Sequence, residues 1–113
     1  MSLISTHVLD TARGQPAAGV HVRLERLGTD GVWAAMARAI TDADGRIASL
    51  LYTDVALEDG DYRLIFSTGD YFRIAGLKEF FPEVVIQVRL EAGGRYHLPL
   101  LLSPFGYSTY RGS

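Results

Sequence analysis

The feature that most constrains this chain is an alternation of apolar and polar residues with a period of two. A β-strand directs successive side chains to opposite faces, so this period is typical of strands with one face on a core. In the segment VHVRLERL, for example, Val20, Val22 and Leu24 fall on one side. The same alternation occurs in residues 3–9, 20–27, 61–67, 83–91 and 96–102. We therefore predict half-buried strands that turn their second face to solvent or a partner.

Turn-forming segments rich in glycine separate these strands. They are ARGQPAAG at 12–19, GTDG at 28–31, DADG at 42–45 and EAGG at 91–94. Short strands at such intervals predict an all-β sandwich of two sheets, with about seven or eight strands. The segment YFRIAGLKEFF after Asp70 lacks the alternation, and we expect a short helix there, with Asp70 as its N-cap and Pro82 as its stop.

A proline inside one apolar strand bears on assembly. Pro99 has no N–H for a sheet ladder, which favours an edge or bulged position for residues 96–102. An edge strand with Leu101 on its second face would expose apolar surface. We therefore expect that a subunit interface covers this face and that the protein is an oligomer.

Composition excludes several functional classes. The 113 residues suffice for one domain, 1–113. A net charge of −2 without a basic run argues against nucleic-acid binding. The absence of cysteine excludes disulfides, zinc fingers and thiol nucleophiles. Apolar runs such as LPLLL are far shorter than the roughly 20 residues that span a bilayer. With no export signal apparent, we expect no membrane partner and a cytoplasmic location.

The three histidines are the leading candidates for acid–base chemistry near neutral pH. His21 alternates outward with Arg23 and Glu25, as an ordinary surface residue does. His7 and His97 also occupy the strand faces opposite to the core, where each by itself is compatible with a plain surface histidine. Arg46 follows the DADG turn, in which Gly45 is expected to supply a positive φ, and starts a strand as an exposed side chain.

Other catalytic motifs are missing from the sequence. Histidines and carboxylates do not occur at metal-ligand spacing, and DADGR lacks the later ligands of a calcium loop, so we predict no metal site. There is no GxSxG motif, and the serines at 5, 49, 103 and 108 lie in no recognised catalytic setting. Two classes stay open on this basis, a cofactor-independent enzyme that uses histidine and a binding or structural module.

The two ends of the chain resemble a known family. STHVLDTARGQPAAGV at 5–20 and YHLPLLLSPFGYSTYRGS at 96–113 are similar to the signature segments of the 5-hydroxyisourate hydrolases, the transthyretin-related enzymes of urate breakdown. TDADGR, GDYRLIFSTGDYF and FFPEV in the middle agree as well, so the resemblance covers essentially the whole chain. The terminal YRGS is the most specific element, because transthyretin carriers are similar elsewhere but lack it.

The resemblance implies a fold, an assembly and a site. The fold would be a transthyretin-like β-sandwich of two four-stranded sheets with one short helix. The assembly would be a homotetramer, a dimer of dimers, with active sites in the channel between dimers. The implied catalytic residues are His7, Arg46, His97 and Ser113. The implied substrate contacts are His7, Arg46, Tyr110, Arg111 and Gly112. The implied enzyme needs no cofactor.

The implied substrate is 5-hydroxyisourate, whose ring opens by hydrolysis of an amide-like C–N bond to 2-oxo-4-hydroxy-4-carboxy-5-ureidoimidazoline. Either His7 or His97 would act as general base on water, and the sequence does not choose between them. Arg46 would orient carbonyl groups and stabilise the oxyanion, and Ser113 would act through its hydroxyl or terminal carboxylate. The alternative is a transthyretin-type carrier of a small aromatic ligand in the same channel, and a third possibility is a structural immunoglobulin-like module.

Overall fold

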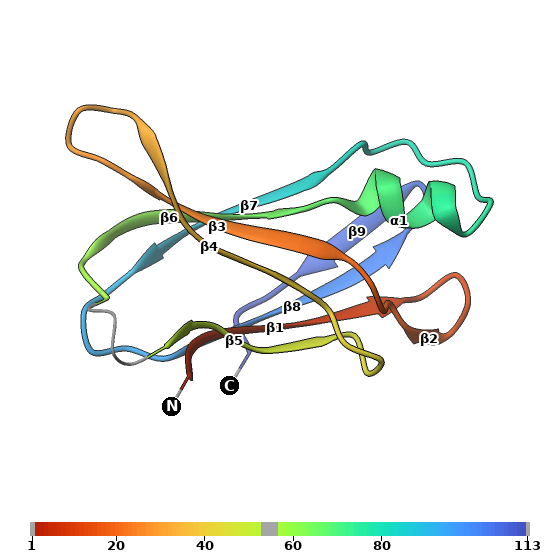
Figure 1. Ribbon diagram of the computed structural model, residues 1–113, viewed down its shortest axis with the longest axis horizontal. Coiled ribbons are helices and arrows are strands. Elements are labelled where there is room, and N and C mark those ends of the chain that lie inside the picture. Colours follow the sequence, from red (N-terminus) through yellow and green to blue (C-terminus); the bar gives the residue numbers. More distant parts are fainter. Residues whose placement is uncertain (1, 53–56, 113) are drawn as a thin grey trace.

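The computed structural model describes residues 2–52 and 57–112, and the chain forms two stacked β-sheets with a short helix at one end (Figure 1). The strands are β1 (Ser2–Asp10), β2 (Gln15–Pro16), β3 (His21–Leu27), β4 (Trp33–Ile40), β5 (Arg46–Tyr52), β6 (Gly60–Phe66), β7 (Val84–Leu90), β8 (Tyr96–Ser103) and β9 (Gly106–Thr109). The helix is α1 (Thr68–Ile74). The predicted two-sheet sandwich is confirmed.

The two sheets differ in their pairing. One has the order β4-β3-β6-β7 and is antiparallel throughout. The other has the order β2-β1-β8-β9, with β5 also paired to β1, and in it β1 and β8 run parallel. The two-residue strand β2 makes this a five-stranded sheet rather than the expected four-stranded one. The parallel pair brings segments that are about 90 residues apart in sequence into one ladder.

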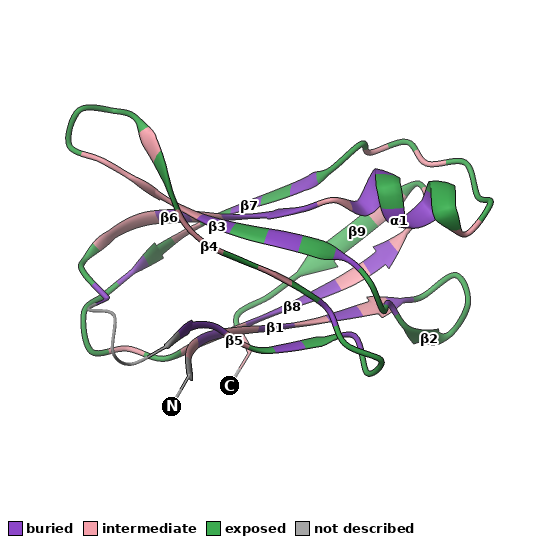
Figure 2. Ribbon diagram, viewed as in Figure 1, coloured by how far each residue is buried: buried purple, intermediate pink, exposed green. Residues whose placement is uncertain are grey.

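The core lies between the sheets and follows the alternation of the sequence. Buried and exposed residues alternate along most strands (Figure 2). Ile4 and Val8 of β1, Val22 and Leu24 of β3, and Leu100 of β8 are at most 1 % exposed. The inward faces predicted from the sequence are therefore correct. Among the residues described, no helix combines the length and the apolar character needed to cross a membrane.

The helix forms where the alternation breaks, but its bounds differ from those expected. It begins after Ser67, which makes no side-chain capping bond, and Asp70 lies within the first turn, paired with Arg73. The predicted N-cap is therefore wrong. Pro82 is not the stop either, because the backbone N–H of Leu77 closes the last turn on the Phe72 carbonyl, well before the proline.

The position predicted for Pro99 is also wrong, because β8 is an interior strand between β1 and β9. The β8–β9 ladder ends at Leu100↔Thr109 and resumes as a single bridge between His97 and Gly112. Continued in register, Pro99 would stand opposite Tyr110, where a donor is needed. The missing N–H of proline therefore falls in this gap of the ladder, which is why an interior strand tolerates it.

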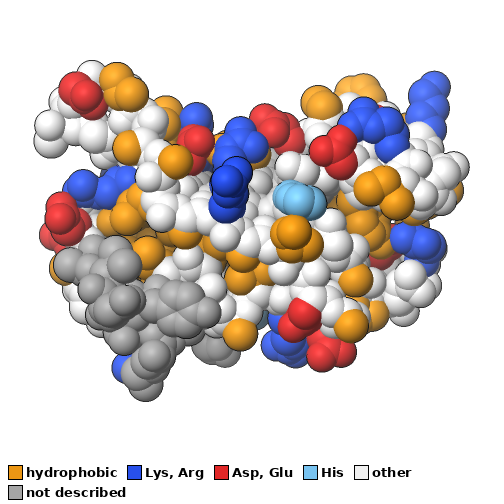
Figure 3. Space-filling view, in the orientation of Figure 1, with side chains coloured by type: hydrophobic (Ala, Val, Ile, Leu, Met, Phe, Trp, Pro, Cys, Tyr) orange, Lys and Arg blue, Asp and Glu red, His pale blue; other side chains and the backbone are white. Residues whose placement is uncertain are grey.

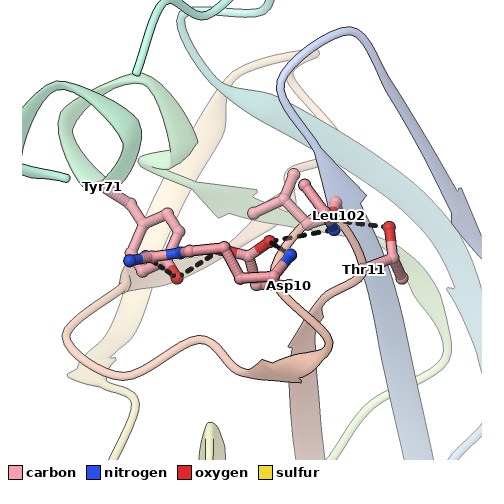
Figure 4. Close-up of polar contacts among 6 residues, drawn as sticks. Asp10, Thr11, Tyr71 and Leu102 are labelled. Atoms are coloured by element: carbon pink, nitrogen blue, oxygen red, sulfur yellow. Dashed lines mark hydrogen bonds and ion pairs between the residues drawn. The ribbon is translucent and has the colours of Figure 1, made fainter. Parts of the chain in front are cut away.

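A buried carboxylate ties the turn after β1 to the helix (Figure 4). Asp10 is 1 % exposed and accepts hydrogen bonds from the Tyr71 hydroxyl at 2.7 Å and from Arg13 Nε at 3.0 Å. Burial by itself would raise the pKa of Asp10, but the hydrogen bonds from Tyr71 and Arg13 outweigh it and leave this pKa below its ordinary value. The carboxylate thus stays ionised and fixes the corner beside α1.

Candidate functional site

The outer face of the five-stranded sheet brings the predicted site residues together. His7 of β1 stands opposite Arg46 of β5, and Ser5 of β1 stands opposite His97 of β8. Their neighbours Thr6 and Leu98 point into the core, so these four side chains share the outward face. Cross-strand partners on one face lie about 5 Å apart at Cβ, which is close enough for two imidazoles and one guanidinium to act on one small molecule.

The turn before β5 determines where Arg46 lies. Asp42 Oδ1 accepts the backbone N–H groups of Asp44 and Arg46, both at 2.9 Å. Gly45 has a φ of 74°, as predicted, and a Cβ at this position would overlap the Val8 carbonyl oxygen. The turn therefore needs glycine both for its conformation and for its close approach to β1.

His7 is held by the same turn. Its Nε2 lies 2.9 Å from the carbonyl oxygen of Asp44. A carbonyl oxygen only accepts hydrogen bonds, so Nε2 carries the proton and donates it. The other ring nitrogen, Nδ1, is the one that remains for a ligand. His7 is half-buried, with its ring orientation set by the backbone of the neighbouring turn.

His97 is half-buried on the adjacent strand, and its Nδ1 lies 2.9 Å from the Ser5 hydroxyl oxygen. Burial lowers the pKa of His97 below its ordinary value, and the nearby charges of His7 and Arg46 lower it further. Both causes disfavour the imidazolium. His97 is therefore a neutral imidazole near pH 7, the form that can accept a proton.

The C-terminal segment lies against His97. The backbone N–H of Gly112 donates to the His97 carbonyl at 2.8 Å, and a Cβ on Gly112 would stand 2.7 Å from His97 Cδ2. Tyr110 is 59 % exposed. Arg111 instead stacks its guanidinium 4.9 Å from the centre of the Tyr96 ring. The last predicted site residue, Ser113, lies outside the described residues.

The structure thus gathers some of the predicted residues more closely than others. His7, Arg46 and His97 share one face, with Gly112 in contact with His97. Arg111 points away from this group, because Tyr96 alternates with His97 along β8 and occupies the other face. The five-stranded sheet therefore presents two imidazoles and one guanidinium on a single open surface.

Ser5 is a site residue that the sequence motifs do not indicate. Like the other serines it lies in no recognised catalytic setting, yet its hydroxyl contacts His97. Its position two residues before His7 puts both on the same strand face, and this was the available signal. The contact itself depends on the parallel β1–β8 register, which the sequence does not reveal.

A separate hollow lies on the other sheet. It measures about 630 Å³, and its lining includes His21, Arg23, Arg38 and Ile40 of β3 and β4. His21 is exposed there, as predicted, and shares no strand with the other histidines. On the side of the molecule seen in Figure 3, basic and acidic side chains are interspersed rather than gathered by sign.

The side chains of the site do not include a metal-ligand cluster among the residues that the structure describes. Within residues 2–52 and 57–112, no three His, Asp or Glu side chains gather in a way that could hold an ion.

Comparisons with known proteins agree on one family. The model of the HIUase/Transthyretin family matches residues 4–112. A 5-hydroxyisourate hydrolase of Salmonella typhimurium is 46 % identical over 113 residues, which cover 99 % of this chain and 82 % of that protein.

Two solved structures share the fold. The 5-hydroxyisourate hydrolase of Klebsiella pneumoniae has a TM-score of 0.86 at 41 % identity, covering 99 % of this chain and 100 % of that one. Sea bream transthyretin in complex with thyroxine has a TM-score of 0.92 at 31 % identity, covering 97 % and 94 %.

Proposed function

Because the chain belongs to the HIUase/Transthyretin family, we propose that it is a 5-hydroxyisourate hydrolase and that residues 1–113 form one catalytic domain. Fold alone does not separate this function from that of a carrier, since the TM-score to sea bream transthyretin, 0.92, is higher than that to the Klebsiella enzyme, 0.86. Sequence identity favours the hydrolase, at 46 % and 41 % against 31 %.

The observation that carries the proposal is the outward face shared by His7, Arg46 and His97. A carrier of apolar aromatic ligands has little use for two imidazoles and a guanidinium, each of which loses hydration when such a ligand covers it. Hydrolysis of a polar cyclic amide uses all three. The site therefore supports the enzyme over the carrier.

In the proposed reaction His97 is the general base. Its pKa, lowered by burial and by the charges of His7 and Arg46, keeps it neutral and ready to accept a proton at physiological pH. Water loses a proton to His97 as its oxygen attacks the ring carbonyl. The same proton then passes to the leaving nitrogen as the C–N bond breaks, so the imidazole returns to its neutral form.

Arg46 and His7 would hold the substrate and the charge that develops on it. The guanidinium of Arg46 is permanently charged and can donate two parallel hydrogen bonds to carbonyl oxygens, which favours the oxyanion of the tetrahedral intermediate. His7 keeps its Nε2–H on the Asp44 carbonyl and offers Nδ1 to the substrate. No electrons are transferred, so the reaction requires no redox cofactor.

We further propose that the C-terminal residues complete the site, with Gly112 packed on His97 and with Tyr110, Arg111 and Ser113 at its border. Arg111 would reach the substrate only by leaving Tyr96, so we assign it to the border rather than to the reacting atoms. Ser113 would contribute its hydroxyl or its carboxylate.

The proposed assembly is a homotetramer, a dimer of dimers, in which a second copy encloses this face. Support comes from Leu9 of β1 and Leu101 of β8, which are cross-strand partners on the same outward face as His7 and His97 and are only half-buried in one protomer. Sedimentation should give a mass near four chains, whereas a stable monomer at micromolar concentration would contradict the enclosed site.

The activity is tested by the ultraviolet decay of freshly prepared 5-hydroxyisourate, measured against buffer because the compound also decays without enzyme. His7→Asn and His97→Asn should each lower the rate at least about tenfold, since general-base assistance contributes roughly 10²–10⁴-fold. His21→Asn on the other sheet is the matched control and should retain the wild-type rate. Equal rates in all three variants would rule out histidine catalysis.

A further inference from the structure

Ser5 is the one side chain in the described residues that hydrogen-bonds the ring of His97, and nothing in the proposed reaction yet uses it. Its Oγ lies 2.9 Å from Nδ1 across the parallel β1–β8 ladder, in which Ser5 and His97 are direct partners. Both residues are half-buried in rigid strands. The contact is therefore fixed by the backbone register rather than by a mobile loop.

We propose that Ser5 is a positioning residue for His97, accepting a hydrogen bond from Nδ1–H so that Nε2 bears the lone pair that takes the proton of water. This proposal rests on the proposed hydrolase function. It identifies Ser5 as the residue whose hydrogen bond allows His97 to act as the base. The neutral ring has one N–H and one lone pair, and the partner of one nitrogen determines the state of the other.

The direction of this hydrogen bond follows from the proton transfer. When a water proton reaches Nε2, the ring becomes an imidazolium with an N–H at each nitrogen, and Ser5 can only accept from Nδ1. If Ser5 instead donated to Nδ1, Nε2 would carry the hydrogen and could not act as base. Only the accepting arrangement serves both states of the ring without rotation of His97.

The hydrogen bond to Ser5 also counteracts the surroundings of His97 that disfavour its protonated form. The charged and titratable side chains around His97 come from three elements: His7 on β1, Arg46 on β5, and Tyr110 after β9, whereas Arg111 lies over Tyr96 on the other face. Burial and the charges of His7 and Arg46 lower the pKa of His97. An acceptor at Nδ1 favours the imidazolium and so limits this decrease, which keeps the base strong enough to remove a proton.

The test is Ser5→Ala in the full chain, with Ser5→Thr to restore a hydroxyl and Ser67→Ala as the matched control. Ser67 precedes α1 and makes no side-chain capping bond. We expect Ser5→Ala to lower kcat about tenfold with little change in KM, below the roughly 10²–10⁴-fold of general-base assistance as a whole. Ser5→Thr and Ser67→Ala should stay close to the wild-type rate.

Nitrogen-15 NMR of the His97 ring separates this proposal from the activity itself, because it needs no substrate. Wild type should show the proton on Nδ1, and Ser5→Ala should shift the ring toward Nε2–H and lower its pKa, moving the acid limb of kcat/KM to lower pH. A higher pKa in Ser5→Ala, or an unchanged tautomer, overturns the proposal. If the NMR spectrum shows the Nδ1–H tautomer but the protein does not hydrolyse 5-hydroxyisourate, the positioning of His97 by Ser5 stands and the proposed hydrolase function is refuted.

Discussion

The contact between Gly112 and His97 gives the sharpest test of the proposed site. A Cβ added to Gly112 would lie 2.7 Å from His97 Cδ2 and 3.0 Å from the His97 carbonyl oxygen. Carbon atoms in favourable contact are about 3.5–4.0 Å apart, so Gly112→Ala must move the ring or the C-terminal segment by about 1 Å. A displacement of that size at a catalytic group can cost about 10²-fold in rate.

We expect Gly112→Ala to lower kcat/KM for 5-hydroxyisourate by roughly 10–100-fold. The cost to stability should be only about 1 kcal/mol, that of one backbone hydrogen bond near the end of the chain. Gly106→Ala is the matched control on the same hairpin, since its Cβ would meet nothing closer than Ser103 Oγ at 3.7 Å. The rate is measured by ultraviolet decay and the stability by urea denaturation.

Equal activity in Gly112→Ala and Gly106→Ala would contradict a role for this contact. Unchanged His97 ring resonances in the NMR spectrum of Gly112→Ala would contradict it as well, because the predicted overlap would then be relieved without moving the ring. Loss of activity together with unfolding would show that Gly112 supports the sheet rather than the site.

Three further predictions concern pH, the C-terminus and the buried carboxylate. Because the pKa of His97 lies below its ordinary value of about 6.5, the acid limb of kcat/KM should fall below pH 6.5. The stability that neutral His97 contributes should be fully present above about pH 6.5 and should be lost as the pH decreases from there through the lowered pKa of the folded protein. Deletion of residues 110–113 should lower kcat/KM at least about tenfold, as general-base positioning is lost, with the circular dichroism of the sheets retained. A tag after Ser113 should have a similar effect if the terminus closes the site. Tyr71→Phe leaves Asp10 short of one buried donor and should reduce the free energy of unfolding by about 1–3 kcal/mol in urea titrations without changing kcat.

The sequence by itself determined which face of each strand enters the core. Alternation placed Val22 and Leu24 inside and His21 outside, because a strand has only two faces and burial of apolar area decides between them. It also determined the DADG turn, since Gly45 adopts a conformation that few other residues tolerate. The spacing of turns and strands predicted the two-sheet sandwich, and the family resemblance then implied catalytic roles for His7, Arg46 and His97.

Only the tertiary structure decided how these faces meet. Local sequence does not encode which strands pair, so Pro99 predicts an edge or bulged position although β8 lies between β1 and β9. The helix bounds likewise depend on closure of its last turn rather than on Pro82. The parallel register of β1 and β8 sets Ser5 against His97, and the antiparallel pairing of β1 and β5 sets His7 beside Arg46. Contacts between residues far apart in the sequence, such as His7 with Asp44 and Ser5 with His97, arise from packing of the whole sandwich, and such contacts hold both histidines of the site.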